Sequence, residues 1–281
     1  MANYTAADIK ALRERTGAGM LDVKKALDEA DGDSEKALEI IRVKGLKGVA
    51  KREGRSTSEG LVAVDVSETE GGQVATLIEL NSETDFVAKN ENFLNLAARV
   101  LTAVAASGAA DVDAALAADA DGESVQLVID NTAASLGEKV VLRRTTRVAG
   151  ERVTAYLHRT AKDLPPSIGV VVATDVAGEA VAKEIAQHVA AMSPTYLTRE
   201  DVPEDVVASE RRIAEETSRN EGKPEAALPK IIEGRLNGFF KDTVLVEQGF
   251  VKEPKQSIAQ LLETLGADAT VRRFVRVKIG E

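Results

Sequence analysis

The side chains best suited to a binding function lie at one junction of the chain. Asp85 and Phe86 stand side by side within 81–93, after an apolar run at 74–80 and before an alanine- and leucine-rich run. The first run predicts a buried strand and the second a helix. The chain has only six phenylalanines and no tryptophan. A carboxylate beside an apolar ring at such a corner can project outward, as an acidic tip and a wedge that enter a partner's surface.

A purely structural explanation of this pair stays open from the sequence. Asp or Thr at the start of a helix commonly accepts hydrogen bonds from free backbone N–H groups, and Phe commonly packs in the core. On position alone, cap and core are the commoner roles. The wider pattern of residues, given below, favours the wedge.

The chain lacks the residue patterns of most catalytic sites. It has no cysteine, which excludes disulfides, thiolate metal sites and a cysteine nucleophile. Its two histidines, His158 and His188, are far apart, and no zinc motif or phosphate-binding loop appears. Gly17-Ala-Gly19 lacks the strand and third glycine of a dinucleotide site. We therefore expect no enzyme, no metal site and no cofactor.

Composition narrows the class of protein further. At 281 residues, two or three modules are more probable than one, and 3% aromatic residues predict a mostly aliphatic core. The start of the chain has no secretory segment, and no apolar run approaches the roughly 20 residues that cross a membrane. We expect a cytoplasmic protein without a membrane partner. The net charge of −10 argues against wholesale binding to nucleic acid, so no direct nucleic-acid partner is expected.

One segment departs from this acidic balance. Residues 1–55 hold 12 Lys and Arg against 10 Asp and Glu, and 42–55 contain six basic side chains with one acid, Glu53. Gly45-Leu-Lys-Gly48 also fits the Gly-x-x-Gly pattern with which some domains clamp RNA. An RNA-binding module is therefore an alternative, although a solvated charge run is the commoner explanation.

The N-terminal region predicts a small helical domain. A capping-box-like start at Thr5 and Asp8 opens the first of three short helices. Breaks at 17–19 and 31–33 separate them, and the third helix begins near Ser34. The Gly-, Ser- and Thr-rich stretch at 54–60 is a credible linker.

After the linker the hydrophobic period changes from helix to strand. Runs at 61–66 and 74–80 flank Glu70-Gly71-Gly72 and predict a β-hairpin. Further strands are predicted at 140–148, 152–158, 168–173 and 270–279, and helices at about 123–136, 178–192 and 257–265. The segment 103–120 is helical or loosely ordered. Since strands and helices cluster and do not strictly alternate, the fold class is α+β.

A proline- and charge-rich segment at 194–229 predicts a protruding helical hairpin joined at Glu221-Gly222-Lys223-Pro224. The predicted division is a three-helix domain at 1–55, a core subdomain at 56–142, and a second at 143–281 that carries the hairpin. A faint repeat supports two related subdomains, because Thr84-Asp85 and Thr174-Asp175 each follow a strand and precede a helix.

Several motifs resemble those of the bacterial elongation factor Ts family. They are Leu12–Met20, Asp22–Leu27 and Thr84–Lys89, with shorter matches at 188–191, 233–235 and 248–250. The resemblance runs from the first helix to the last strand. It implies a guanine nucleotide exchange factor that binds elongation factor Tu–GDP, displaces Mg²⁺ and promotes GDP release during translation elongation. It also implies a ubiquitin-associated-like N-terminal domain and a core of two related subdomains with an inserted antiparallel helical hairpin.

The resemblance assigns site residues one position at a time. Thr84, Asp85, Phe86 and Val87 match the segment that intrudes near the partner's nucleotide site and dislodges Mg²⁺. The matched partner-binding positions are Arg13, Met20, Leu21, Lys24, Leu136, Gly137 and His158. Without the resemblance, Arg13 and Lys24 would be assigned to a solvated helix face and Met20 to the core.

This chain departs from the family pattern in two places. An enlarged loop at 159–167, with Pro165-Pro166, follows His158, and the C-terminal helix that some relatives use on the partner is absent. The hairpin could form a homodimer, touch the partner or do neither, and the sequence leaves these roles open. A hydrolase that uses His158 is the third and weakest alternative.

Overall fold

The computed structural model describes residues 3–16, 18–266 and 268–281, and for 46–51 it describes the backbone alone. Its N-terminal part is a group of three helices, α1 (Ala6–Thr16), α2 (Met20–Glu29) and α3 (Ser34–Arg52). The carboxylate of Asp8 accepts the backbone N–H of Thr5 at 2.7 Å, as the predicted capping box requires. Asp31 and Gly32 turn the chain between α2 and α3 with positive φ. Gly17, in the first predicted break, lies outside the described residues.

The first half of the core is a three-stranded antiparallel sheet covered by helices. Its strand order is β1-β2-β5, and β1 and β2 form the predicted hairpin. The elements are β1 (Glu59–Thr69), β2 (Gly72–Ser82), α4 (Asp85–Ala88), α5 (Glu91–Ser107), α6 (Val112–Ala117), β3 (Asp119–Ala120), β4 (Glu123–Ser124), α7 (Val125–Leu136) and β5 (Val140–Gly150).

The second half repeats this plan with a sheet of order β10-β7-β6. Two short strands, β8 and β9, follow the two helices inserted after α8. The elements are β6 (Arg152–His158), β7 (Ile168–Thr174), α8 (Glu179–Met192), β8 (Gly249–Phe250), β9 (Glu253–Ser257), α11 (Ile258–Glu263) and β10 (Val271–Lys278).

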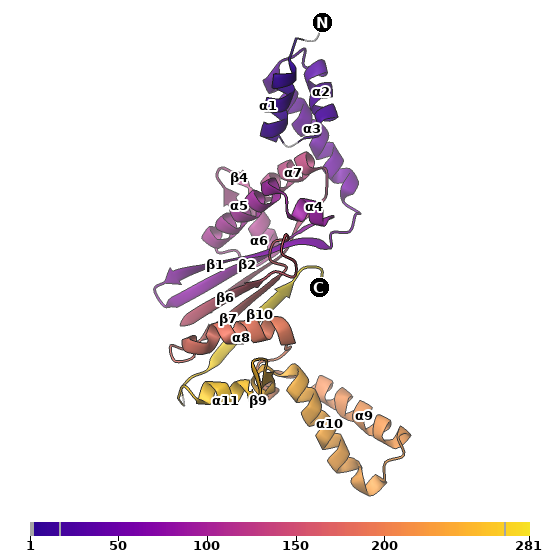
Figure 1. Ribbon diagram of the computed structural model, residues 1–281, viewed down its shortest axis with the longest axis vertical. Helices are drawn as coiled ribbons and strands as arrows, with labels where there is room; N and C mark the ends of the chain where they lie inside the picture. Colours follow the sequence, from indigo (N-terminus) through magenta and orange to yellow (C-terminus); the bar gives the residue numbers. More distant parts are fainter. Residues whose placement is uncertain (1–2, 17, 267) are drawn as a thin grey trace.

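The two sheets pack face to face, with helices on both outer sides (Figure 1). In β2, Ile78 and Leu80 join the core under α5 and α7, while Leu77 points between the sheets. This alternation follows from the two-residue period of a strand. Gly169 lies against the other sheet, and a Cβ atom at this position would lie 2.4 Å from Cγ1 of Val62. Glycine at this position therefore permits the layered arrangement.

A helical hairpin projects from the second half of the core (Figure 1). It consists of α9 (Glu204–Asn220) and α10 (Leu228–Thr243), with short 3₁₀ turns η1 (Arg199–Asp201), η2 (Glu225–Ala227) and η3 (Leu245–Glu247) beside them. The predicted range 194–229 is therefore wrong for the second helix. Pro229 lies in the first turn of α10, where the missing N–H has no intrahelical acceptor, so this proline starts a helix instead of ending one.

The α+β class is confirmed, since helices and antiparallel sheets segregate into separate layers. The division into domains stays a prediction, and its boundary at 142/143 falls inside β5, which pairs with β2 from Val140 to Gly150. None of the helices in the described part of the chain combines the length and apolar character needed to cross a bilayer.

Two motifs that are distant in sequence meet beneath the hairpin. The ring of His188, on α8, is fully buried and lies 2.9 Å from Oε1 of Gln248 through Nε2. The backbone N–H of Val251 donates to Nδ1 of the same ring at 3.1 Å. The amide of Gln248 in turn donates to the carbonyl of Asp242 at 2.7 Å, near the end of α10. His188 thus ties α8 to the base of the hairpin and is a structural residue.

Candidate partner-binding site

The corner between β2 and α5 is held by one threonine. Thr84 is the N-cap of the one-turn helix α4, and its hydroxyl oxygen accepts the backbone N–H of Val87 at 3.4 Å. The same hydroxyl donates to one carboxylate oxygen of Glu138 at 2.6 Å, and the N–H of Thr84 donates to the other at 3.0 Å. Glu138 therefore fixes the turn from a position 54 residues away. The cap role is confirmed for Thr84.

Phe86 does not belong to the core. Its side chain is 72% exposed, whereas Val87 and Ala88 are buried beneath it. Because α4 has a single turn, burying Val87 and Ala88 directs the preceding ring outward. The alternative that Phe86 packs inside is wrong. An exposed phenylalanine on an anchored turn is the geometry expected of a wedge.

Two charged side chains flank this ring. The ammonium group of Lys89 lies 3.5 Å from a carboxylate oxygen of Asp85 and 4.7 Å from the centre of the Phe86 ring. The side chain of Asp85 is 44% exposed. Such an exposed pair contributes little to stability. The turn therefore presents an apolar surface, a carboxylate and a cation together, all accessible to a partner.

Leu136 and Gly137 lie next to this turn because the residue that follows them, Glu138, is bonded to Thr84. Leu136 ends α7 and is partly buried against the core, and Gly137 caps the helix with φ of +79°. Glu138 follows immediately and carries both hydrogen bonds to Thr84. The end of α7 and the wedge thus form one local unit.

Sequence reasoning missed the residues that hold this unit together. Besides Glu138, Glu83 accepts the backbone N–H of Lys139 at 2.6 Å and the guanidinium of Arg55 at 3.1 Å. Arg55 belongs to the linker that follows α3. The only sequence signal was the position of Glu83 and Glu138 next to matched motifs, because no local pattern reports a pairing across more than 50 residues.

His158 makes no described contact with the Phe86 turn. It is the last residue of β6, it is exposed, and its Nδ1 lies 3.0 Å from the hydroxyl of Tyr156. Its neighbours Leu157 and Arg159 line an apolar groove of about 340 Å³ that also includes Lys89. The enlarged loop at 159–167 forms one wall, where the carbonyl of Pro166 accepts the N–H of Val62 at 2.9 Å.

The four matched residues of the N-terminal helices are all exposed. Arg13 lies on α1, and Met20, Leu21 and Lys24 lie on α2. Met20 is 60% exposed and Leu21 72% exposed, so the core assignment of Met20 is wrong. These residues sit apart from α4, although α4 lies at the end of the core nearest to α3 (Figure 1). The structure therefore offers two separate exposed apolar surfaces.

The Gly-x-x-Gly segment has a packing explanation. A Cβ atom on Gly45 would lie 2.4 Å from Cβ of Ala134, so this glycine permits α3 to touch α7. Gly48 lies among the residues whose side-chain surroundings are not described. The first glycine of the pattern thus serves helix packing, and no observation favours an RNA clamp.

At the second copy of the repeated corner, the aspartate stabilises the turn that precedes α8. Asp175 is buried and accepts the N–H of Gly178 at 2.7 Å and the N–H of Thr270 at 2.8 Å. Burial alone would raise the pKa of this carboxyl, but the bonds from Thr270 and Gly178 outweigh it and hold the pKa below its usual value. In the first copy the cap is Thr84, so Asp85 is free to face solvent.

Comparison with known proteins agrees with the motifs. Residues 83–281 match the family model described as elongation factor TS. The chain is 68% identical to elongation factor Ts of Beutenbergia cavernae, over the whole of both chains. It is 61% identical to elongation factor Ts of Renibacterium salmoninarum and 60% identical to that of Micrococcus luteus, again over the whole of both chains.

Proposed function

The chain belongs to the elongation factor Ts family, and from this premise we propose that it releases GDP from elongation factor Tu by inserting the Phe86 turn beside the nucleotide site. The family role is nucleotide exchange on elongation factor Tu in translation elongation, which involves no covalent chemistry by the exchange factor. The observation that carries the mechanism is the 72% exposure of Phe86 on a turn fixed by Glu138.

The proposed step begins with the apolar ring. Phe86 enters a pocket of the partner and displaces a helix or loop that contributes to the nucleotide site, because packed interfaces shift between discrete arrangements. The turn resists this displacement, since Thr84 is held through both its hydroxyl and its N–H. The rigid anchor ensures that the partner yields while the wedge keeps its shape.

The carboxylate acts on the charge balance around Mg²⁺. Asp85 disturbs the water and charge network that holds the cation, and loss of Mg²⁺ weakens binding of the diphosphate. Coupling of this kind is reciprocal. The exchange protein lowers the partner's affinity for nucleotide by the same ratio as nucleotide lowers the partner's affinity for the exchange protein.

The N-terminal helices provide a second contact in this proposal. Arg13, Met20, Leu21 and Lys24 bind the GTPase domain of the partner, while Leu136, Gly137 and His158 extend the core contact around the wedge. The exposure of Met20 and Leu21 supports this role, because large apolar side chains gathered on one small domain suit an interface. We also propose a cytoplasmic location and no nucleic-acid partner.

The test measures release of a fluorescent GDP from elongation factor Tu with and without the chain. We expect strong acceleration by the unchanged chain and a large loss of it in Phe86→Ala, with circular dichroism and thermal unfolding nearly unchanged because the side chain is exposed. Acceleration that survives the substitution would remove Phe86 from the mechanism. If the chain accelerates nothing, the exchange function itself is wrong.

The structure offers a matched control and a second variant. Val176 is 51% exposed at the equivalent corner of the second half, so Val176→Ala removes an exposed apolar group without touching the wedge. Glu138→Gln leaves Phe86 in place and weakens the anchor of its turn. We expect full exchange activity in the first and reduced activity in the second.

A further inference from the structure

A groove separates the N-terminal helices from the core over part of their shared boundary. Its volume is about 510 Å³, and its walls come from α1 and α3 on one side and from α5 and α7 on the other. Apolar side chains face it from both sides, with Leu38 and Ile41 on α3 and Leu96 and Val128 on the core. Apolar packing is thus incomplete here, so other contacts must fix the orientation of the N-terminal helices.

One such contact is a close approach of two helices. Gly45 of α3 lies against Ala134 of α7, with only 2.4 Å available to a Cβ atom. Further along α3, the guanidinium of Arg52 donates to the carbonyl of Ala133 at 3.4 Å. Both contacts lie in the C-terminal half of α3, and together we call them the pivot.

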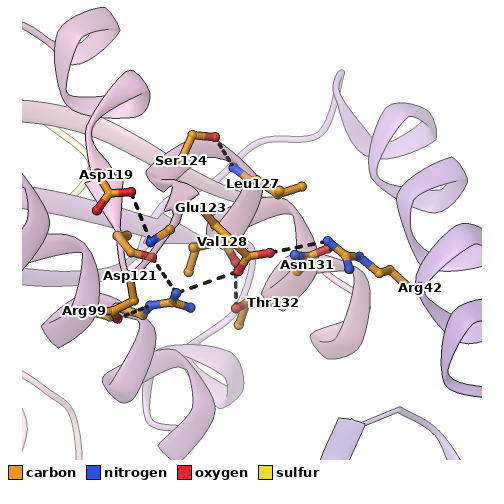
Figure 2. A network of polar contacts seen from close by, with 12 residues as sticks. Arg42, Arg99, Asp119, Asp121, Glu123, Ser124, Leu127, Val128, Asn131 and Thr132 are labelled. Atoms are coloured by element: carbon orange, nitrogen blue, oxygen red, sulfur yellow. Dashed lines mark hydrogen bonds and ion pairs between the residues drawn. The ribbon is translucent and has the colours of Figure 1, made fainter. Parts of the chain in front are cut away.

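A polar contact lies one helical turn before this pivot. Arg42 of α3 reaches across to the core, where its Nε donates to Oδ1 of Asn131 at 3.2 Å and its NH2 lies 3.4 Å from Oε1 of Glu123 (Figure 2). Asn131 lies on α7 and Glu123 on the short strand β4. One side chain of the N-terminal helices is thus bound to two separate elements of the core.

The acceptor Glu123 is itself held in place from the core side. Its other oxygen, Oε2, lies 3.7 Å from NH2 of Arg99 on α5. Arg99 is fixed by the carbonyl of Ala120 at 2.6 Å and by the carboxylate of Asp121 at 3.1 Å. Figure 2 shows this chain of contacts running from Arg99 through Glu123 to Arg42. The carboxylate of Glu123 therefore joins two arginines, one from each side of the groove.

We propose that Glu123, with Arg42 and Asn131, is a clasp that sets the orientation of α1–α3 relative to the core. The pivot at Gly45 and the clasp one turn away define two points, and two points fix the rotation of α3 on α7. This inference rests on the proposed function, in which the N-terminal helices and the Phe86 wedge bind one partner. Glu123 is then a positioning residue, because the clasp holds these two contacts at a preset spacing. A preset spacing lowers the ordering entropy lost on binding.

The clasp is too weak to contribute much to folding stability, but it is strong enough to favour one orientation of the N-terminal helices. The side chains of Arg42 and Glu123 are 51% and 35% exposed, and pairs of this kind contribute little to folding stability. A contribution of this size is enough to shift the balance between two orientations of a domain by about two- to fivefold. Removing the clasp should therefore leave the fold intact and broaden the range of orientations.

The orientation can be measured on the free full-length chain. Because the chain has no cysteine, Lys10→Cys on α1 and Asp113→Cys on α6 introduce two unique and exposed spin-label sites. Pulsed electron–electron double resonance then reports the distance distribution between them. We expect one narrow population in the labelled chain, and a distribution broadened by an added population in Glu123→Gln and in Arg42→Gln. The double variant should resemble either single one, since both substitutions break the same clasp.

Asp121→Asn is the matched control. It removes a carboxylate from Arg99 in the same network, and the described side chains of α3 form no ion pair with Asp121, so the narrow distribution should persist. Added salt should broaden the unchanged chain toward the Glu123→Gln distribution, since ionic strength screens exposed pairs. If Glu123→Gln and Arg42→Gln both keep the original distribution, the clasp is wrong and other contacts between α3 and the core set the orientation.

Exchange assays separate this inference from the proposed function. With the clasp broken, we expect GDP release at low concentrations of the chain to slow by about two- to fivefold, while the rate at saturating chain stays near that of the unchanged protein. A broadened distribution without any exchange activity in the unchanged chain would overturn the proposed function and leave the clasp as a structural fact. A broadened distribution with an unchanged exchange rate at low concentration would overturn its positioning role.

Discussion

Phe86 is exposed because its neighbours are fixed. Val87 and Ala88 pack into the core on one side, and Thr84 is bound to Glu138 on the other, so a one-turn helix has no rotation left that would bury the ring. At the same corner in the second half, the buried carboxylate of Asp175 accepts the N–H of Gly178 in the turn before α8, and Val176 is exposed. The difference between the two corners thus depends on which residue holds the turn.

The contacts of His188 fix the tautomer of its ring. The N–H of Val251 can only donate, so Nδ1 of the ring accepts and the proton lies on Nε2, facing Gln248. A second proton on Nδ1 would break the bond from Val251. Burial lowers the pKa of His188, and the bond to Gln248 opposes this only in part.

The sign of the pH dependence follows from this lowered pKa. The unfolded chain takes up a proton near pH 6.5, the ordinary value for histidine, whereas the folded chain resists it. Stability from His188 is thus complete above about pH 6.5 and is lost as the pH falls toward the lower folded pKa. Urea unfolding between pH 7.5 and 5.5 should show a steeper loss in the unchanged chain than in His188→Gln, by at most about 1.4 kcal/mol per pH unit. Equal slopes would show that His188 does not titrate differently on unfolding.

At the scale of elements, the contact between the two sheets decides whether the core can form four layers. Val171 and Ala173 of β7 and Leu77 of β2 fill this interface, while Val170 and Val172 face α8 on the other side. A sheet with both faces covered has no alternation of polar and apolar residues, and 168–173 accordingly reads as one apolar run. Its single glycine, Gly169, lies against Val62 of the other sheet.

We expect Gly169→Ala to destabilise the chain by about 1–3 kcal/mol, because its Cβ would overlap Cγ1 of Val62. The measurement is the free energy of unfolding in urea. Combining it with Val62→Ala removes the overlapping methyl groups, so the double variant should lose less than the two single losses added together. Strict additivity would mean that the strain is relieved elsewhere and that Gly169 does not set the spacing of the sheets.

At the scale of the whole molecule, the chain is elongated, with the N-terminal helices at one end and the hairpin of α9 and α10 at the other (Figure 1). The wedge lies between them, near the end that carries Met20 and Leu21. A partner that touches the N-terminal helices and the Phe86 turn together is thus contacted by two exposed surfaces of one rigid body, provided that the clasp at Glu123 holds.

The proposed role of Mg²⁺ gives a test at this scale. If the chain acts largely by dislodging the cation, then elongation factor Tu–GDP stripped of Mg²⁺ by a chelator has already undergone that step. We expect the ratio of GDP release with and without the chain to be smaller in chelator than in excess Mg²⁺. Restoring Mg²⁺ should restore the ratio. An equal ratio in both conditions would show that the chain acts on the diphosphate or its loops without involving the cation.

The local elements of this protein could be predicted from its sequence. The hairpin of β1 and β2, the helix that ends at Gly137 and the strands on both sides of Gly150 follow from hydrophobic period and turn residues, which act over a few positions. The end of α10 could not be predicted in this way, because Pro229 starts a helix as readily as it ends one and only packing decides. The residues of the wedge were found through motifs, and the exposure of Phe86 was a hypothesis until Val87 was seen to be buried.

The aliphatic core, the lack of thiol chemistry, the fold class and the family all follow from the amino-acid sequence. The bonds from Thr84 to Glu138 and from His188 to Gln248, the contact of Gly45 with Ala134, and the two arginines at Glu123 follow only from the folded arrangement. The physical reason is the range of the interactions. Hydrophobic period and capping act between residues a few positions apart, whereas these pairs are separated by 24 to 89 positions and exist only because the layers of the fold place them in contact.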